Sequence, residues 1–208
     1  MPAPDAPPRR DVRRAQVLAA ARQLVAEGGL EALTIGALED RLEFTRGVIT
    51  WHFRNKDEIV EAVLAGAIDE IDAATSAEVR ASNDPRAAVR AVLASKVHGF
   101  LEHPEATRIL LSFWGRLHAD GRAAELNAAL YRRYRQEAAR FAGERLGAPH
   151  RAESLASLMV GTVIGIVLQA TFDPGAIDVE AAIDEAARTV VAGLGADGAR
   201  RTAKVRRT

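Results

Sequence analysis

The sequence contains no cysteine, which excludes disulfide bonds, thiolate catalysis and cysteine-ligated zinc. None of the five histidines is part of a His-Glu-x-x-His pattern, and none follows a glutamate by three residues. The spacings of zincins and of di-iron helical bundles are therefore missing. No phosphate-binding loop ending in Gly-Lys-Ser/Thr occurs either. We therefore predict no metal and no cofactor. These absences also argue against the alternative that the protein is an enzyme.

The alternation of apolar and polar residues that marks a β-strand is also absent. The 208 residues are long enough for a sizeable core, and 48% of them are hydrophobic. Glycine and proline gather near the ends and at short joints. The sequence predicts an all-α fold of about nine helices. Beyond the first three, the expected ranges are 55–80, 85–102, 109–117, 122–145, 154–172 and 178–194.

We expect no secretory signal, because the first residues, MPAPDAPPRRDVRR, include no apolar segment. Only Ser154–Phe172 has the length and lack of charge to approach the ~20 residues that span a bilayer. Several hydroxyl and amide side chains interrupt this segment, and a core helix or a subunit interface needs the same composition. We predict a cytoplasmic protein without membrane association, with a spanning helix as the alternative.

The net charge of zero is distributed unevenly. Residues 1–56 carry +2, residues 57–197 carry −7 and residues 198–208 carry +5. Basic ends around an acidic body suit a protein that contacts polyanions, although a solvated basic tail is the alternative for the C-terminus. At the start of a first helix, expected over 12–27, Arg13 and Arg14 oppose the helix dipole. A nearby phosphate would explain them.

The stretch Leu33–Lys56 has the pattern of a helix-turn-helix. Thr34 precedes apolar residues spaced by three and four, which predicts a capped helix. Glu43-Phe44 interrupts this run, and Thr45 begins a second helix. We expect the polar and aromatic side chains of the second helix to face outward, namely Thr45, Arg46, Thr50, Trp51 and His52.

The last two helices carry a pattern for pairing with a second copy of the chain. Small residues recur at every fourth position, which lets another helix approach closely. A twofold four-helix bundle would cover them. A central helix fully buried in a monomer is the alternative. The predicted dimer interface comprises Ser157, Gly161, Gly165, Leu168, Ile183 and Val190.

Aromatic side chains and isolated polar groups are spread over helices of the body that should face one another. A mostly apolar cavity with few polar contacts is how proteins hold small molecules. Ordinary core packing is the alternative. The candidate ligand residues are Phe100, Phe113, Trp114, His118, Tyr131, Met159, Thr162 and Gln169.

The run RGVITWHFRNKDEIV, with the helices around it, resembles the TetR family of bacterial transcriptional regulators over residues 12–64. The segment PEATRILLSFWGRLHADGRAAELNAALYRRYR is similar to the ligand domains of members related to the choline–betaine regulators. The resemblance implies DNA-facing positions on the recognition helix and a phosphate-contacting lysine. With the two arginines and Thr34, the predicted DNA contacts are Arg13, Arg14, Thr34, Thr45, Arg46, Gly47, Val48, Thr50, Trp51, His52 and Lys56.

Three residues depart from the family pattern. Thr50 stands where a phosphate-contacting tyrosine is usual, and Glu43 where glycine is frequent. A left-handed Glu43 would cost ~1 kcal/mol. Glu39 replaces a small residue and adds repulsion near phosphates. These departures predict weak binding, or a greater dependence on the arginine-rich arm.

The sequence thus predicts a homodimeric repressor that binds a near-palindromic operator on double-stranded DNA and is released by a small, mostly apolar effector. Its expected parts are a flexible basic arm (1–11), a DNA-binding domain (12–56), an effector-binding and dimerisation domain (57–195) and a basic tail (196–208). A helical DNA-binding or structural protein without an effector is the alternative.

Overall fold

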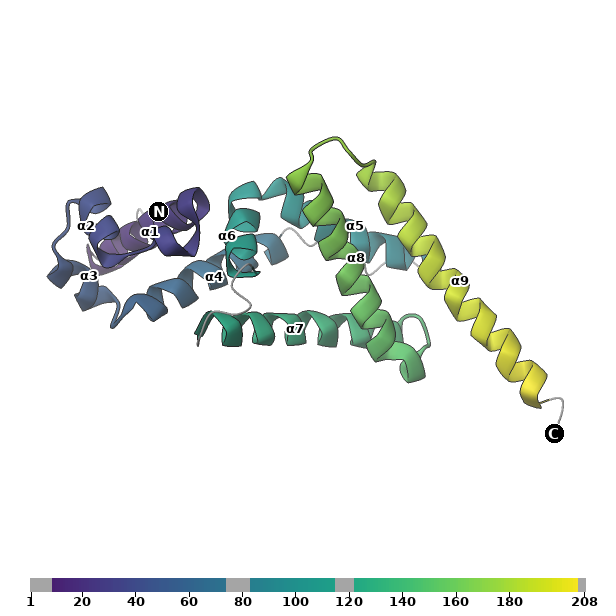
Figure 1. Cartoon of the computed structure of the whole chain (residues 1–208). Coiled ribbons are helices and arrows are strands. Elements are labelled where there is room, and N and C mark those ends of the chain that lie inside the picture. Colours follow the sequence, from purple (N-terminus) through teal and green to yellow (C-terminus); the bar gives the residue numbers. More distant parts are fainter. Residues whose placement is uncertain (1–8, 74–82, 115–121, 206–208) are drawn as a thin grey trace, which may run out of the picture. The chain divides into compact units, whose positions relative to one another are not determined.

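The computed structural model describes the backbone of residues 9–73, 83–114 and 122–205 (Figure 1). Over these residues the chain is helical and forms no strand, which confirms the predicted all-α fold. The elements are α1 (Arg9–Ala32), α2 (Ile35–Leu42), α3 (Arg46–His52), α4 (Lys56–Ala73), α5 (Pro85–Glu102), α6 (Pro104–Trp114), α7 (Arg122–Glu144), the 3-10 helix η2 (Pro149–Arg151), α8 (Ala152–Phe172) and α9 (Val179–Val205).

Several helices begin where the sequence provides a cap. Asn55, Asp84 and Asp178 each accept the backbone N–H three residues further on, at 2.9, 2.9 and 3.0 Å. These bonds satisfy donors that the first turn of a helix leaves unpaired. The helix starts expected near residues 55, 85 and 178 are confirmed.

Several helix boundaries differ from the expected ones. Helix α1 begins at Arg9 and not at residue 12, so residues 9–11 of the expected flexible arm are helical. Gly29, with φ 71°, kinks α1, and a short helical turn continues to Ala32. Helix α6 begins at Pro104, because proline suits the first position of a helix. Helix α9 continues to Val205 instead of ending near residue 194. The glycines in its last part weaken a helix without ending it.

The described residues divide into two compact units. Unit 1 comprises Met1–Glu70 and His103–Asn127, so it contains α6 and most of α4 besides the predicted DNA-binding helices. Arg22 of α1 explains this boundary, because it forms ion pairs with Glu70 at 2.6 Å and with Glu105 at 3.1 Å. The core of unit 1 includes Val17, Val25, Leu38, Ile49, Phe53, Ile59, Ile109 and Phe113.

Unit 2 comprises Ile71–Glu102 and Ala128–Thr208. Helix α5 packs against both α8 and α9. Arg90 of α5 forms ion pairs with Glu180 and Asp184 of α9, each at 2.5 Å. The core of unit 2 includes Val89, Leu93, Val97, Leu155, Val163, Val167, Ile183 and Val190.

Candidate nucleic-acid interface

Helices α2 and α3 form the predicted helix-turn-helix. The hydroxyl of Thr34 accepts the N–H of Ala37 at 3.0 Å and caps α2. Glu43 ends α2 with φ 53° and ψ 29°, in the left-handed region expected at this turn. Thr45 precedes α3 with an extended backbone, but its hydroxyl makes no capping bond. The start of α3 therefore presents free donors at the surface.

One face of α3 is exposed and the other packs into unit 1. Arg46, Gly47, Thr50 and Trp51 are exposed, whereas Ile49 is fully buried. Trp51 is 62% exposed, which is unusual for so large an apolar side chain. An exposed polar and aromatic helix face preceded by free N–H groups can contact a nucleic acid.

His52 does not face outward, so its expected orientation was wrong. Its side chain is buried, because it lies three residues after Ile49 on the inner side of α3. Its Nδ1 has no hydrogen-bond partner within the described residues. Burial lowers the pKa of His52 below its ordinary 6.5, and the positive charges of three arginines in α1 lower it further. His52 is therefore a neutral packing residue at neutral pH.

Thr50 is exposed, but its hydroxyl already has an acceptor. It donates to the carbonyl oxygen of Arg46 one turn earlier, at 3.0 Å. This bond occupies the hydroxyl proton that was expected to reach a phosphate. The methyl group of Thr50 remains available for apolar contact.

Three arginines of α1 lie over aromatic rings of the helix-turn-helix. Their guanidinium carbons stand 5.0, 6.0 and 4.8 Å from the ring centroids. The pairs are Arg10 with Trp51, Arg13 with Phe44, and Arg14 with Phe53. Arg10 is absent from the predicted contacts. No short-range pattern indicates that Arg10 reaches Trp51, because the two residues are distant in the chain.

Helix α4 begins beside α3 with Lys56, which is half-buried. The side chain of Glu58 accepts the backbone N–H of Arg54 at 2.8 Å. This backbone hydrogen bond, and a second one from the Arg54 side chain, lower the pKa of Glu58. Asn55 caps α4, but Glu58 bonds to the backbone N–H of Arg54 and not to that of Asn55. The hydrogen bond between Arg54 and Glu58 fixes the direction of the chain immediately before Lys56.

The candidate ligand residues lie in both units, and each unit contains only part of the set. In unit 1, Phe113 is fully buried and Trp114 is half-buried. His118 lies outside the described residues. In unit 2, Phe100 and Met159 are buried, Tyr131 and Thr162 are half-buried, and Gln169 is exposed.

Tyr134 in α7 was not among the predicted ligand residues, yet its hydroxyl is buried without a hydrogen-bond partner in the described part of the chain. Lys96 and Arg133 lie 5.8 and 5.7 Å from its ring centroid. Asp72 pairs with both cations. Burial raises the pKa of Tyr134, and it raises that of Tyr131 to about 12. Both phenols are therefore neutral groups at physiological pH.

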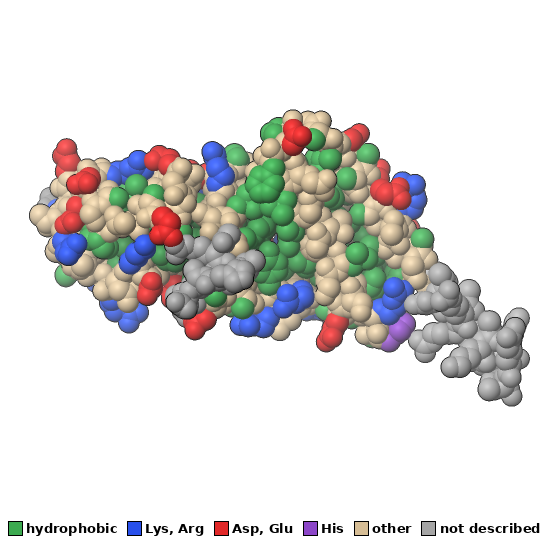
Figure 2. All heavy atoms as spheres, viewed as in Figure 1, with side chains coloured by type: hydrophobic (Ala, Val, Ile, Leu, Met, Phe, Trp, Pro, Cys, Tyr) green, Lys and Arg blue, Asp and Glu red, His purple; other side chains and the backbone are tan. Residues whose placement is uncertain are grey.

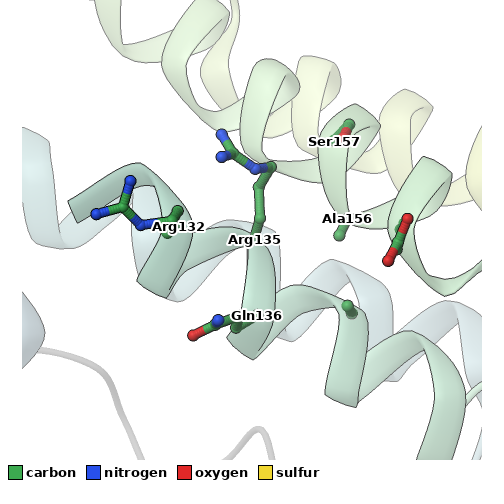
Figure 3. Close-up of a pocket in the computed structure, with 7 residues that line it drawn as sticks. Arg132, Arg135, Gln136, Ala156 and Ser157 are labelled. Atoms are coloured by element: carbon green, nitrogen blue, oxygen red, sulfur yellow. The ribbon is translucent and has the colours of Figure 1, made fainter. Parts of the chain in front are cut away.

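A groove of about 360 Å³ lies between α7 and α8 (Figure 3). None of the predicted ligand residues lines it. Arg132, Arg135 and Gln136 project from α7, and Ala156 and Ser157 come from α8. Its surface is polar at the rim because both arginines are exposed. Among the described residues, no group of three or more His, Asp or Glu side chains is arranged to hold a metal ion.

Helix α8 leaves a strip of apolar and small residues uncovered. Leu158 is 49% and Phe172 is 74% exposed, and a Cβ added at Gly161 or Gly165 would meet nothing within 4 Å. Figure 2 shows hydrophobic side chains at the surface along α8. The segment Pro149–Phe172 is long and apolar enough to cross a membrane by length and composition, and about a third of its most apolar window is buried.

The predicted dimer residues fall into two groups. Ser157, Gly161, Gly165 and Leu168 are exposed or half-buried on α8. Ile183 and Val190 are buried, at 0% and 3% exposure, since α9 packs along α5. The structure therefore assigns these two residues to the core of unit 2 and not to an outer face.

Two family models match the sequence. Residues 17–63 match the family described as bacterial regulatory proteins, tetR family. Residues 85–196, more than half of the chain, match the C-terminal domain of BetI-type transcriptional repressors. Both resemblances drawn from the sequence are thereby confirmed.

Known proteins are similar along most of the chain. The HTH-type transcriptional regulator BetI of Burkholderia thailandensis is 28% identical over 176 residues, covering 84% of this chain and 89% of that protein. A transcriptional regulator from Rhodococcus has the same fold, with a TM-score of 0.71, 23% identity, and coverage of 86% of this chain and 96% of that one. A protein from Saccharomonospora viridis, solved in complex with choline, gives a TM-score of 0.65 at 17% identity, covering 85% and 94%.

Proposed function

Because the chain belongs to the TetR family of bacterial transcriptional regulators, with a C-terminal domain of the BetI repressor type, we propose that it represses genes as a homodimer bound to a near-palindromic operator. A small effector releases it from the DNA. We assign DNA binding to residues 12–56, and effector binding and pairing to residues 57–195, with a basic arm before and a basic tail after them. This activity takes place in the cytoplasm.

The exposed face of α3 carries the proposal for DNA binding. Arg46 is exposed and has no carboxylate partner within the described residues, so its guanidinium is free to bind guanine through two hydrogen bonds. Gly47 has room for a side chain, since an added Cβ would first meet Thr45 at 3.9 Å. Internal packing therefore does not require glycine here. A close approach of α3 to the base edges of DNA would explain the glycine at position 47.

The dimer sets the distance between two copies of α3. In a helix-turn-helix dimer the two recognition helices lie one turn of DNA apart, ~34–36 Å, in successive major grooves. An effector that favours another spacing weakens binding, and such coupling is typically worth ~1–3 kcal/mol. The proposal therefore requires both pairing and an effector site.

The test of DNA binding is a titration of the full chain with labelled DNA that flanks its own gene, against DNA of shuffled sequence. We expect a sequence preference that Arg46→Ala removes. Arg86→Ala is the matched control, because Arg86 is another exposed helical arginine without a carboxylate partner among the described residues. An Arg46→Ala protein that keeps the full preference would contradict the assignment of α3.

The uncovered strip on α8 supports pairing of two copies. Exposed Leu158 and Phe172 flank glycines that present no side chain, so a second helix can approach closely and bury this apolar surface. Burial contributes about 25 cal/mol per Å² of apolar surface. We assign Ser157, Gly161, Gly165 and Leu168 to this interface. A partner helix, and not lipid, covers the strip.

Light scattering after gel filtration tests the dimer. The wild-type chain should have twice the monomer mass of 22.3 kDa at micromolar concentration. Gly161→Arg should shift it to the monomer, because the added side chain fits the free surface but blocks a second helix. Ala129→Arg, on an exposed face of α7, is the control. A wild-type mass of 22.3 kDa would exclude the homodimer.

An unpaired hydroxyl supports an effector site in unit 2. A buried hydroxyl without a hydrogen bond costs about 1–3 kcal/mol, and a ligand that bonds to Tyr134 would remove this cost. Half-buried Tyr131 and the mostly apolar residues of α8 lie in the same unit. We therefore propose a small, mostly apolar effector with few polar contacts. Phe100, Met159, Thr162 and Gln169 of unit 2 remain proposed ligand residues.

Choline is the first compound to test, because a protein of the same fold was solved with it. The chain bound to its operator is titrated with choline and then with uncharged apolar compounds of similar size. A rise in the Kd for DNA with any of them supports release by an effector. If none changes the Kd or the melting temperature, the chain is a DNA-binding protein without an effector.

A further inference from the structure

The Arg10–Trp51 pair is an exposed cation on an exposed aromatic ring. The guanidinium carbon of Arg10 stands 5.0 Å from the ring centroid of Trp51, which is 62% exposed. Arg10 lies in the first turn of α1 and Trp51 near the end of α3. The pair therefore joins the arginine-rich start of the chain to the proposed DNA-reading helix.

The positive charge around this pair is only partly balanced inside the protein, by Asp11 in the same turn of α1 and by Glu58, which lies within reach of the charge of Arg14. Within the described residues, Arg10, Arg13 and Arg14 contact aromatic rings and none forms an ion pair with a carboxylate. In the same unit, Arg22 and Arg41 pair with glutamates at 2.6 and 2.7 Å. Cations in the first turn also oppose the helix dipole. An external anion would balance this charge.

The geometry of stacking leaves Arg10 able to bind that anion. A guanidinium lying over a ring keeps its N–H donors at its edge, where they can bond to phosphate oxygens in pairs. Stacking also restricts the long side chain, so less freedom is lost when a ligand binds. The neighbouring Thr50 cannot supply the same donor, because its hydroxyl bonds to the carbonyl oxygen of Arg46.

We propose that Arg10 and Trp51 together form a binding site for one phosphate of the DNA backbone, next to the base-reading face of α3. This inference rests on the proposed DNA binding and adds a contact that the reading helix lacks. Trp51 orients the guanidinium, and Arg10 makes the contact. The site contributes to affinity for any sequence, since phosphates carry no base identity.

The salt dependence of DNA binding gives the expected size of the effect. Each neutralised phosphate contributes about −0.9 to the slope of log K against log salt, so two copies of Arg10 contribute ~1.8. Arg10→Ala should flatten the slope by this amount. The affinity ratio of wild type to variant should then be about twelvefold larger at 50 mM than at 200 mM salt. Operator and shuffled DNA should show the same change.

Variants of Trp51 test whether stacking matters. Trp51→Phe keeps an aromatic face and should retain most of the affinity, whereas Trp51→Ala should weaken binding. In the Arg10→Ala background, Trp51→Ala should have a much smaller effect, because the guanidinium that it orients is gone. Equal losses in both backgrounds would mean that Trp51 contacts DNA independently, which overturns the composite site.

Two controls separate this inference from the proposed function. Arg86→Ala should leave the salt slope unchanged. The melting temperatures of all variants should match that of wild type, because the side chains of Arg10, Trp51 and Arg86 are exposed. If Arg46→Ala removes the sequence preference but Arg10→Ala leaves the slope unchanged, the phosphate site is wrong and the function stands. If the wild-type chain binds neither the flanking DNA nor the shuffled DNA, both are wrong.

Discussion

Replacement of Glu43 by glycine should stabilise the protein. Glu43 has φ 53° and ψ 29° and is the one non-glycine residue with positive φ in the described part of the chain. A left-handed backbone costs an L-residue about 1–2 kcal/mol, and glycine avoids this cost. Glycine also loses roughly 0.5–1 kcal/mol more conformational freedom on folding. The net gain expected for Glu43→Gly is therefore about 0.5–1 kcal/mol.

Glu39→Gly is the matched control for this prediction. Glu39 lies inside α2 with a helical backbone, so the same exchange should cost about 1 kcal/mol there. Both variants remove one carboxylate from the same helix-turn-helix, which cancels the effect of the lost charge on stability. Only the backbone conformation differs between the two positions.

Thermal unfolding followed by circular dichroism measures the difference. A change of 1 kcal/mol shifts the melting temperature of a protein of this size by about 2–4 °C. Glu43→Gly should therefore melt about 3–8 °C above Glu39→Gly. If Glu43→Gly is as destabilised as Glu39→Gly, the left-handed conformation is not the source of the cost, and the reasoning fails.

Three further predictions concern single side chains. Thr34→Ala should lower the free energy of unfolding by about 1 kcal/mol, because it removes the 3.0 Å capping bond to Ala37. Urea titration measures this loss, and Thr34→Ser, which keeps the cap, is the control. The pKa of His52 is lowered in the folded protein, so His52 binds a proton more readily in the unfolded chain. The free energy of unfolding should therefore be unaffected above about pH 6.5 and should fall as the pH decreases below it. Urea unfolding from pH 7.5 to 5.5 measures this, and a His52→Gln protein with an unchanged pH dependence would refute the role of His52. Tyr134→Phe should preserve or raise the melting temperature, since it removes a buried hydroxyl without a partner, and calorimetry should detect weaker effector binding.

The local order of the helices follows from the sequence alone. Caps such as Asp84 and Asp178 act through hydrogen bonds to residues three positions away, so short-range patterns are enough to identify them. The left-handed turn at Glu43 and the two family resemblances also depend on residues that are neighbours in the chain. For the same reason the helix-turn-helix and its exposed Arg46 were predictable.

The contacts between distant residues required the tertiary structure. Periodicity places His52 on α3, but only the packing of the helix decides that it faces inward. Ile183 and Val190 form an apolar stripe that suits a dimer as well as a core, and the packing of α9 against α5 assigns them to the core. The meeting of Arg10 with Trp51 joins residues 41 positions apart. Sequence spacing determines which residues share a helix face, whereas packing determines what that face contacts.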